Sequence, residues 1–97
     1  MLNSKQRARL RSIASTIDAT TIVGKDGLTD MVLAQIDREL DKREMVKVSV
    51  LDGAELSARD YLHQAAASLN AEEVCFIGRK FVVYRKSNRQ GIKHIEF

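Results

Sequence analysis

The sequence predicts an α/β fold, a compact single domain in which a mixed four-stranded sheet packs with three helices. Its 97 residues are enough for one hydrophobic core and leave little room for a second domain. Segments whose apolar residues recur with a helical period alternate with short β-branched runs, in the order α-β-α-β-α-β-β. Strands joined through helices are expected to run parallel, and the last strand, which follows a tight turn, should be antiparallel to its neighbour.

The first helix is expected over residues 4–17 and the first strand over residues 20–23. Within this helix the apolar residues fall at i, i+3, i+4 and i+7, and they are Leu10, Ile13, Ala14 and Ile17. Basic residues flank the stripe on both sides, so the helix can dock through its aliphatic face while its charges stay in solvent. The strand is the β-branched run that follows Asp18-Ala19.

The second helix is expected from Thr29 to about Lys42, with Thr29 as its N-cap. Its core-facing stripe consists of Leu28, Val32, Ile36 and Leu40. Residues 45–51 begin with alternating apolar and polar side chains, which is typical of a strand with one covered face. Asp52-Gly53 then closes this strand as a turn.

The third helix is expected to open at Ser57, which with Asp60 occupies the positions of a capping box, and to end at Asn70. Its apolar stripe consists of Leu62, Ala65, Ala66 and Leu69. Two further strands, at residues 74–77 and 81–84, form the expected hairpin around Gly78-Arg79-Lys80. Residues 86–97 are mostly polar and basic, and we expect them to be a partly mobile tail of the same domain, which spans residues 1–97.

The turn between the first strand and the second helix, Gly24-Lys25-Asp26-Gly27, is a candidate anion site. Glycine tolerates a positive φ and, having no Cβ, lets a ligand approach the backbone. The unpaired N–H groups at the start of the next helix carry partial positive charge, which suits a phosphate. Lys25 adds an ammonium, whereas the Asp26 carboxylate repels phosphate. Taken alone, this spacing is more often an ordinary strand-to-helix connection, so its function depends on the rest of the chain.

Basic residues gather at the two ends of the chain. Residues 1–11 have a net charge of +4 and residues 79–97 of +5, whereas the residues between them sum to −6. If the fold brings the ends together, they form one cationic face that attracts a polyanion. The alternative is a pair of frayed, solvated ends.

Nothing in the sequence predicts catalysis, a cofactor or a metal centre. His63 and His94 have no cysteine or carboxylate at metal-ligand spacing, and Cys75 is expected to be a buried, inert thiol. Phe81 and Tyr84 could present rings to a base, although core packing is the commoner use of such residues. One cysteine excludes an internal disulfide, and neither a secretory signal nor a membrane span is recognisable. We therefore expect a soluble, cytoplasmic, non-enzymatic protein with no small-molecule substrate and no membrane partner.

Several blocks of the sequence, taken together and in order, carry a family resemblance. They are Lys5-Gln6-Arg7 with Leu10-Arg11, Ile22-Val23-Gly24-Lys25-Asp26-Gly27-Leu28-Thr29, Glu44-Met45-Val46-Lys47-Val48, and Ile77-Gly78-Arg79 with Val83-Tyr84-Arg85. This combination closely resembles the YhbY-like family, the stand-alone bacterial form of the CRM (chloroplast RNA splicing and ribosome maturation) domain, over nearly the whole chain. The departures are Ala19 in place of an expected proline, Asp26 in place of a neutral loop residue, and an ending in Phe97.

The resemblance implies a fold similar to the C-terminal domain of bacterial translation initiation factor three. It also implies RNA binding through a GxxG loop like that of K-homology domains, and association with the RNA of large-ribosomal-subunit precursors. Carried over, the RNA-binding residues are Gly24, Lys25, Asp26 and Gly27 in the loop and Lys5, Arg7, Arg9, Arg11, Arg79, Lys80 and Arg85 on the basic surface. Two alternatives stay open: a general RNA chaperone or K-homology-like binder of other RNAs, and a module that docks on ribosomal proteins.

Overall fold

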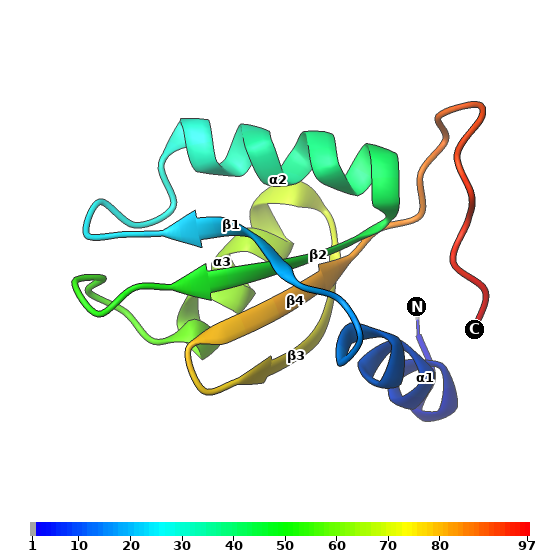
Figure 1. Cartoon of the computed structure of the whole chain (residues 1–97), viewed down its shortest axis with the longest axis horizontal. Coiled ribbons are helices and arrows are strands. Elements are labelled where there is room, and N and C mark those ends of the chain that lie inside the picture. Colours follow the sequence, from blue (N-terminus) through cyan, green and yellow to red (C-terminus); the bar gives the residue numbers. More distant parts are fainter. Residues whose placement is uncertain (1) are drawn as a thin grey trace.

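The computed structural model describes residues 2–97 (Figure 1). Over these residues the chain forms three helices and four strands in the predicted order, which confirms the predicted fold class. They are α1 Ser4–Ala14, β1 Ala19–Val23, α2 Asp30–Arg43, β2 Met45–Val50, α3 Ala58–Leu69, β3 Glu72–Ile77 and β4 Lys80–Tyr84. The first helix ends three residues before the predicted boundary, since the hydroxyls of Ser15 and Thr16 donate hydrogen bonds to carbonyls three residues earlier (2.7 Å each). The other boundaries lie within two residues of the prediction.

The strands form one sheet in the order β1-β2-β4-β3. β1 and β2 are parallel, and β4 is antiparallel to both β2 and β3, as the connections predict. The position of β4 between β2 and β3 was not predicted. Its residues Phe81, Val82 and Val83 are at most 2% exposed, which means that both faces of β4 are covered, as in a central strand.

Each edge strand of the sheet contains a β-bulge. The extra residue is Thr20 in β1 and Val74 in β3. At each of these places the edge strand advances by two residues while the neighbouring strand advances by one. The bulge in β1 brings two successive side chains to the same carboxylate. Thr20 and Thr21 both donate hydroxyl hydrogen bonds to Glu39 of α2.

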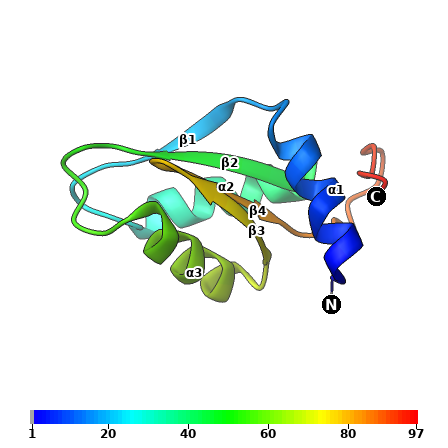
Figure 2. The ribbon, with the colours of Figure 1, turned by 90° about the horizontal axis from the view of Figure 1, so that it is seen from below.

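The two faces of the sheet are covered unequally (Figure 2). α2 and α3 cover one face, where the main core includes Ile36, Leu40, Tyr61, Leu62 and Phe81. α1 and the C-terminal segment lie on the other face, over a smaller core of Leu10, Ala14, Met45, Val74, Val82 and Tyr84. This second layer leaves part of its face open, and the exposed side chains of Ile22 and Ile77 lie there.

The predicted capping residues are in place, but the capping box predicted at Ser57 and Asp60 is only half formed, since the described hydrogen bonds include that to the Ser57 hydroxyl and none from the Asp60 side chain. The hydroxyls of Thr29 and Ser57 each accept a hydrogen bond from a backbone N–H three residues later (3.2 Å each), and Asn70 ends α3 in the left-handed conformation. The cap of α1 was not predicted. There Asn3 and Gln6 form a reciprocal capping box, with hydrogen bonds of 2.8 and 3.0 Å.

The C-terminal segment, residues 86–97, has no helix or strand but folds back onto a buried carboxylate. The side chain of Glu44 is 0% exposed, and its two oxygens accept hydrogen bonds from the backbone N–H groups of Ser87 (2.6 Å) and Ile95 (2.8 Å). The ring of Phe97 packs edge-on against Tyr84, with 5.2 Å between ring centroids. These contacts give the segment a defined path beside α1 (Figure 1). Its partial mobility stays a prediction.

Candidate nucleic-acid interface

The two glycines of the Gly24–Gly27 turn have different structural roles. The turn is closed by a 3.0 Å hydrogen bond from Gly27 N to Gly24 O, and Gly27 has a φ of 70°, the region that favours glycine. A Cβ at Gly27 would also lie 3.5 Å from the hydroxyl of Tyr61, whereas a Cβ at Gly24 would meet only Leu51, at 4.0 Å. Gly27 therefore supports the backbone conformation, and Gly24 leaves open space. Because the Gly27 N–H is already paired within the turn, it is not available to a phosphate.

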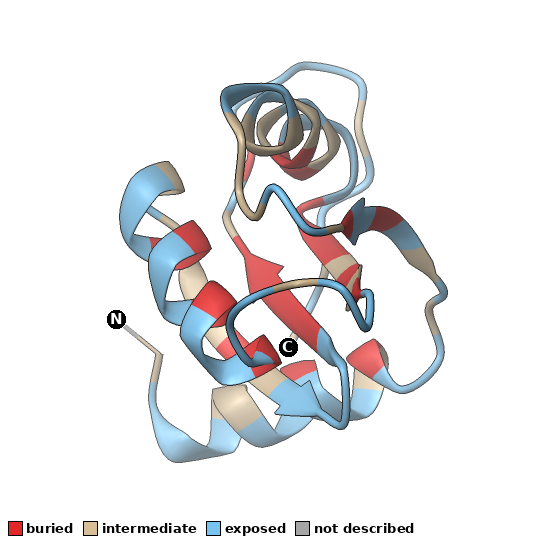
Figure 3. Ribbon diagram, turned by 90° about the vertical axis from the view of Figure 1, so that its left-hand side faces the viewer, coloured by how far each residue is buried: buried red, intermediate tan, exposed pale blue. Residues whose placement is uncertain are grey.

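Three loops meet at the end of the sheet where this turn lies (Figure 3). The Gly24–Gly27 turn is beside the connection between β2 and α3, since a Cβ on Gly53 would lie 3.8 Å from that of Lys25. The hairpin tip joins the same end through Arg79, whose guanidinium lies 2.9 Å from the Asp52 carboxylate. Both partners of this ion pair are largely exposed, so it contributes little to stability. Acidic and basic side chains are mixed at this end, and its charge is not strongly positive.

A different surface, the face of the sheet that α1 covers only in part, carries mainly basic and apolar side chains, of which Val82 is buried under α1. Strand pairing places two rows of side chains on it, Ile22–Ser49–Lys80–Ile77 and Ala19–Lys47–Val82–Cys75. We call these two rows the open sheet face. Lys47 and Lys80 lie on neighbouring central strands within it, and apolar side chains separate them from the edges of the sheet. Such a face offers both cations and contact area to a ligand.

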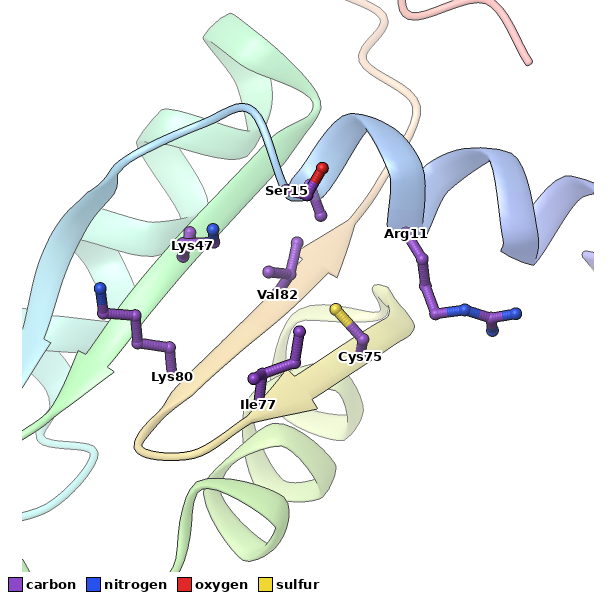
Figure 4. Close-up of a pocket in the computed structure, with 8 residues that line it drawn as sticks. Arg11, Ser15, Lys47, Cys75, Ile77, Lys80 and Val82 are labelled. Carbon is purple, nitrogen blue, oxygen red and sulfur yellow. The ribbon is translucent and has the colours of Figure 1, made fainter.

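A pocket of about 250 Å³ lies where the open sheet face meets α1 (Figure 4). Its lining includes Arg11, Ala14, Ser15, Lys47, Cys75, Ile77, Lys80 and Val82. Among the residues that the structure describes, this lining contains three cations and no carboxylate. The ammonium of Lys47 donates a 3.0 Å hydrogen bond to the carbonyl of Ile17, which fixes its position while two of its three donors stay free.

Two of the sequence-predicted site residues come together at this pocket. Arg11, from the last turn of α1, and Lys80, from the start of β4, both line it although they are far apart in the sequence. Lys5 and Arg9 are exposed elsewhere on α1. Arg7 is half-buried, and its guanidinium donates a 2.6 Å hydrogen bond to the carbonyl of Glu73, which ties α1 to β3.

Arg85, another of the predicted site residues, does not line this pocket. Its side chain is only 22% exposed, and its guanidinium lies 2.9 Å from the Asp37 carboxylate and 3.1 Å from that of Asp41. It also donates to the carbonyl of Leu69 at 2.8 Å, which joins the ends of α2 and α3. Its charge is therefore balanced within the protein, and its predicted contact with RNA stays a prediction without geometric support.

Lys47 was missed as a site residue, although the sequence contains a signal for it. Val46 and Val48 on either side of it belong to the main core under α2 and α3, so strict alternation along β2 places Lys47 on the opposite face. The sequence does not show that this opposite face is partly uncovered. How much of this face is uncovered depends on how far α1 extends across the sheet, and the sequence does not give that.

The remaining titratable side chains near the site do not form a reactive group. Cys75 is only partly buried, so the prediction of a buried thiol is wrong in that respect. Its partial burial still raises the pKa of the thiol, and the nearby charges of Lys47 and Arg11 act in the opposite sense without cancelling it. The thiol is thus largely neutral near pH 7. Within residues 2–97 no cluster of three or more histidine, cysteine or acidic side chains could hold a metal ion. None of the helices that the structure describes is long and apolar enough to cross a bilayer.

Three comparisons with known proteins find relatives that this chain matches over nearly its whole length. The family model for the CRS1/YhbY (CRM) domain matches residues 2–85. The chain is 35% identical over 96 residues to Probable RNA-binding protein YqeI of Bacillus subtilis, an alignment that covers 99% of this chain and 98% of the relative. An RNA-binding protein of Haemophilus influenzae is 29% identical over 92 residues, covering 95% and 93% of the two chains. The solution structure of hypothetical protein SAV1595 from Staphylococcus aureus superposes with a TM-score of 0.78 at 34% identity, covering 93% and 94%. The chain therefore belongs to the CRS1/YhbY (CRM) domain family.

Proposed function

We propose that this protein binds RNA, and that the RNA backbone crosses the open sheet face beside α1. The observation that carries the proposal is that Arg11, Lys47 and Lys80, which come from three different elements, line one pocket without a carboxylate in the described lining. Cations from three elements on one surface attract a polyanion whatever its sequence. The names of the relatives in Bacillus subtilis and Haemophilus influenzae support the same ligand class.

The Gly24–Gly27 turn serves as a second contact in this proposal. Lys25 is exposed at its tip, and Gly24 leaves the backbone accessible. The carboxylate of Asp26 in the turn and that of Asp52 beside it weaken the local attraction for phosphate. We therefore assign the larger share of the electrostatic attraction to the open sheet face and α1, and a smaller share to the turn.

A titration of single-stranded RNA at several salt concentrations tests the binding proposal. If roughly four to six phosphates are neutralised, the logarithm of the affinity should fall against the logarithm of the salt concentration with a slope of about −3 to −4. A slope near zero would contradict a cationic RNA-binding face. It would favour a protein whose basic residues serve only its solubility while it docks on other proteins.

We propose that the partner is the RNA of the large ribosomal subunit or of its precursor particles, as the family resemblance implies. This assignment places the protein in the cytoplasm and in ribosome assembly, with no catalytic step of its own. Sedimentation of a tagged copy from a cell lysate through a density gradient tests it. We expect co-migration with large-subunit precursors at low salt and release from them at high salt. A pool that stays at the top of the gradient at low salt would instead indicate a binder of other RNAs.

A further inference from the structure

We infer that the pocket between α1 and the open sheet face holds one unpaired nucleotide of a single-stranded RNA. The base would lie on the apolar floor and its phosphate at the cationic rim. The inference rests on the proposed RNA binding and adds to it, because cations alone are enough to bind a phosphate backbone. What requires a further explanation is the apolar floor.

That floor is an apolar surface beside positive charge, and its exposed part is Ile77, whose side chain is 75% exposed. Val82, which is buried beneath α1, and the partly buried Cys75 form the inner part of the floor. Exposed aliphatic side chains cost free energy in water unless a partner covers them. Beside Lys47 and Lys80, that partner has to combine a flat apolar group with a negative charge. A nucleotide has both, in its base and its phosphate.

The size and shape of the pocket favour part of a chain over a free small molecule. Its volume of about 250 Å³ is below the range of roughly 300 to 1,000 Å³ that is typical of sites for drug-sized ligands. From Lys80 at the edge of the pocket, a row of side chains continues across the open sheet face through Ser49 to Ile22. A strand of RNA can therefore enter along the sheet and leave beside α1. A duplex cannot use the floor in this way, because its bases are paired and stacked inside it.

The chemistry of Cys75 agrees with this occupant. Burial raises the pKa of its thiol, so the floor is neutral near pH 7 and suits the face of a base. The charges of Lys47 and Arg11 both act on the same sulfur, which means that a ligand on the floor also lies within the field of two cations. Geometry and electrostatics thus point to a single ligand position.

Ile77→Ala tests the inference, because the side chain is exposed and its loss should leave the fold intact. The probes are a single-stranded RNA decamer and the duplex that it forms with its complement. We expect the substitution to weaken binding of the single strand about fivefold while its salt slope stays unchanged, because an apolar contact is lost and no phosphate contact. Binding of the duplex should not change.

Phe76→Ala is the matched control, since Phe76 is the neighbour of Ile77 in β3 but lies on the opposite face of the sheet. It should bind the single strand like the parent. Methyl resonances of Ile77 and Val82 provide a second readout. They should shift when the single strand is added, whereas that of Ile36, in the main core under α2, should not.

The outcomes separate this inference from the proposed function. If Ile77→Ala binds the single strand as tightly as the parent, or if it weakens single strand and duplex equally, the nucleotide pocket is wrong while RNA binding stands. If the parent binds neither RNA, the proposed function itself fails.

Discussion

Glu44→Ala should lower the free energy of unfolding by about 3 kcal/mol, the largest loss we expect from removing one polar side chain here. The carboxylate is completely buried, and it accepts backbone hydrogen bonds from both ends of the C-terminal segment, at Ser87 and Ile95. Without it these N–H groups lose their charged acceptor, and the packing of Phe97 on Tyr84 loses its anchor. Urea denaturation followed by circular dichroism measures the loss.

Glu96→Ala is the matched control for this substitution. It removes the same charge from an exposed position in the C-terminal segment that Glu44 anchors, and we expect a change of less than about 0.5 kcal/mol. If both variants unfold at the same urea concentration as the parent, the contacts of Glu44 do not stabilise the fold, and the C-terminal segment is only loosely attached.

The stabilisation by Glu44 should also depend on pH. Burial acts to raise its pKa, but the hydrogen bonds from Ser87, His94 and Ile95 outweigh burial and hold the pKa below the ordinary value of 4.5. Because the folded-state pKa is the lower one, the unfolded chain takes up the proton first as the pH falls. The difference in stability between parent and Glu44→Ala should be complete near neutral pH. It should narrow below about pH 4.5, as the pH falls through the folded-state pKa.

Removing the three cations of the pocket together should weaken binding of single-stranded RNA about a hundredfold at roughly 0.1 M salt. The variant is Arg11→Ala with Lys80→Ala and Lys47→Met, where methionine keeps the aliphatic stem of the half-buried lysine. Each lost phosphate contact makes the slope of log affinity against log salt shallower by about 0.7, so the slope should change by about two units. Fluorescence anisotropy at four or more salt concentrations measures both quantities.

The control removes the same number of positive charges from the helical layer that covers the other face of the sheet. Arg38→Ala with Arg59→Ala and Lys42→Met removes three exposed cations from α2 and α3. This variant should keep a salt slope within about half a unit of the parent's and lose much less affinity. Equal losses in the two triple variants would mean that net charge alone attracts the RNA, and that the open sheet face has no special role.

The elements of this fold were predictable because their signals are local. Apolar side chains four residues apart, such as Ile36 and Leu40, identify a helical stripe, and Thr29 identifies its start. The place of β4 in the sheet was not predictable in this way. The place of β4 depends on how its side chain Phe81 packs into the main core beneath α2 and α3. This packing joins residues that are far apart in the sequence, so the sequence neighbours of Phe81 do not reveal it.

The candidate site was predictable only in part, for a related reason. Charge clustering singled out Arg11 and Lys80, which do share a pocket, and equally singled out Arg85, whose charge is paired with Asp37 and Asp41. A count of charges cannot distinguish a cation in solvent from one that holds two helices together. Glu44 was missed as a structural residue, because its partners lie more than forty positions later in the chain.

The bulges in the two edge strands limit how a partner can approach this protein. A regular edge strand presents a row of unpaired backbone groups that can template another strand, either in a peptide ligand or in aggregation. Thr20 and Val74 interrupt that row on both edges. Recruitment of a partner by strand addition is therefore disfavoured, and self-association through the edges is disfavoured with it. A ligand therefore meets the protein through the side chains of the partly open sheet face and not through the backbone of its edges.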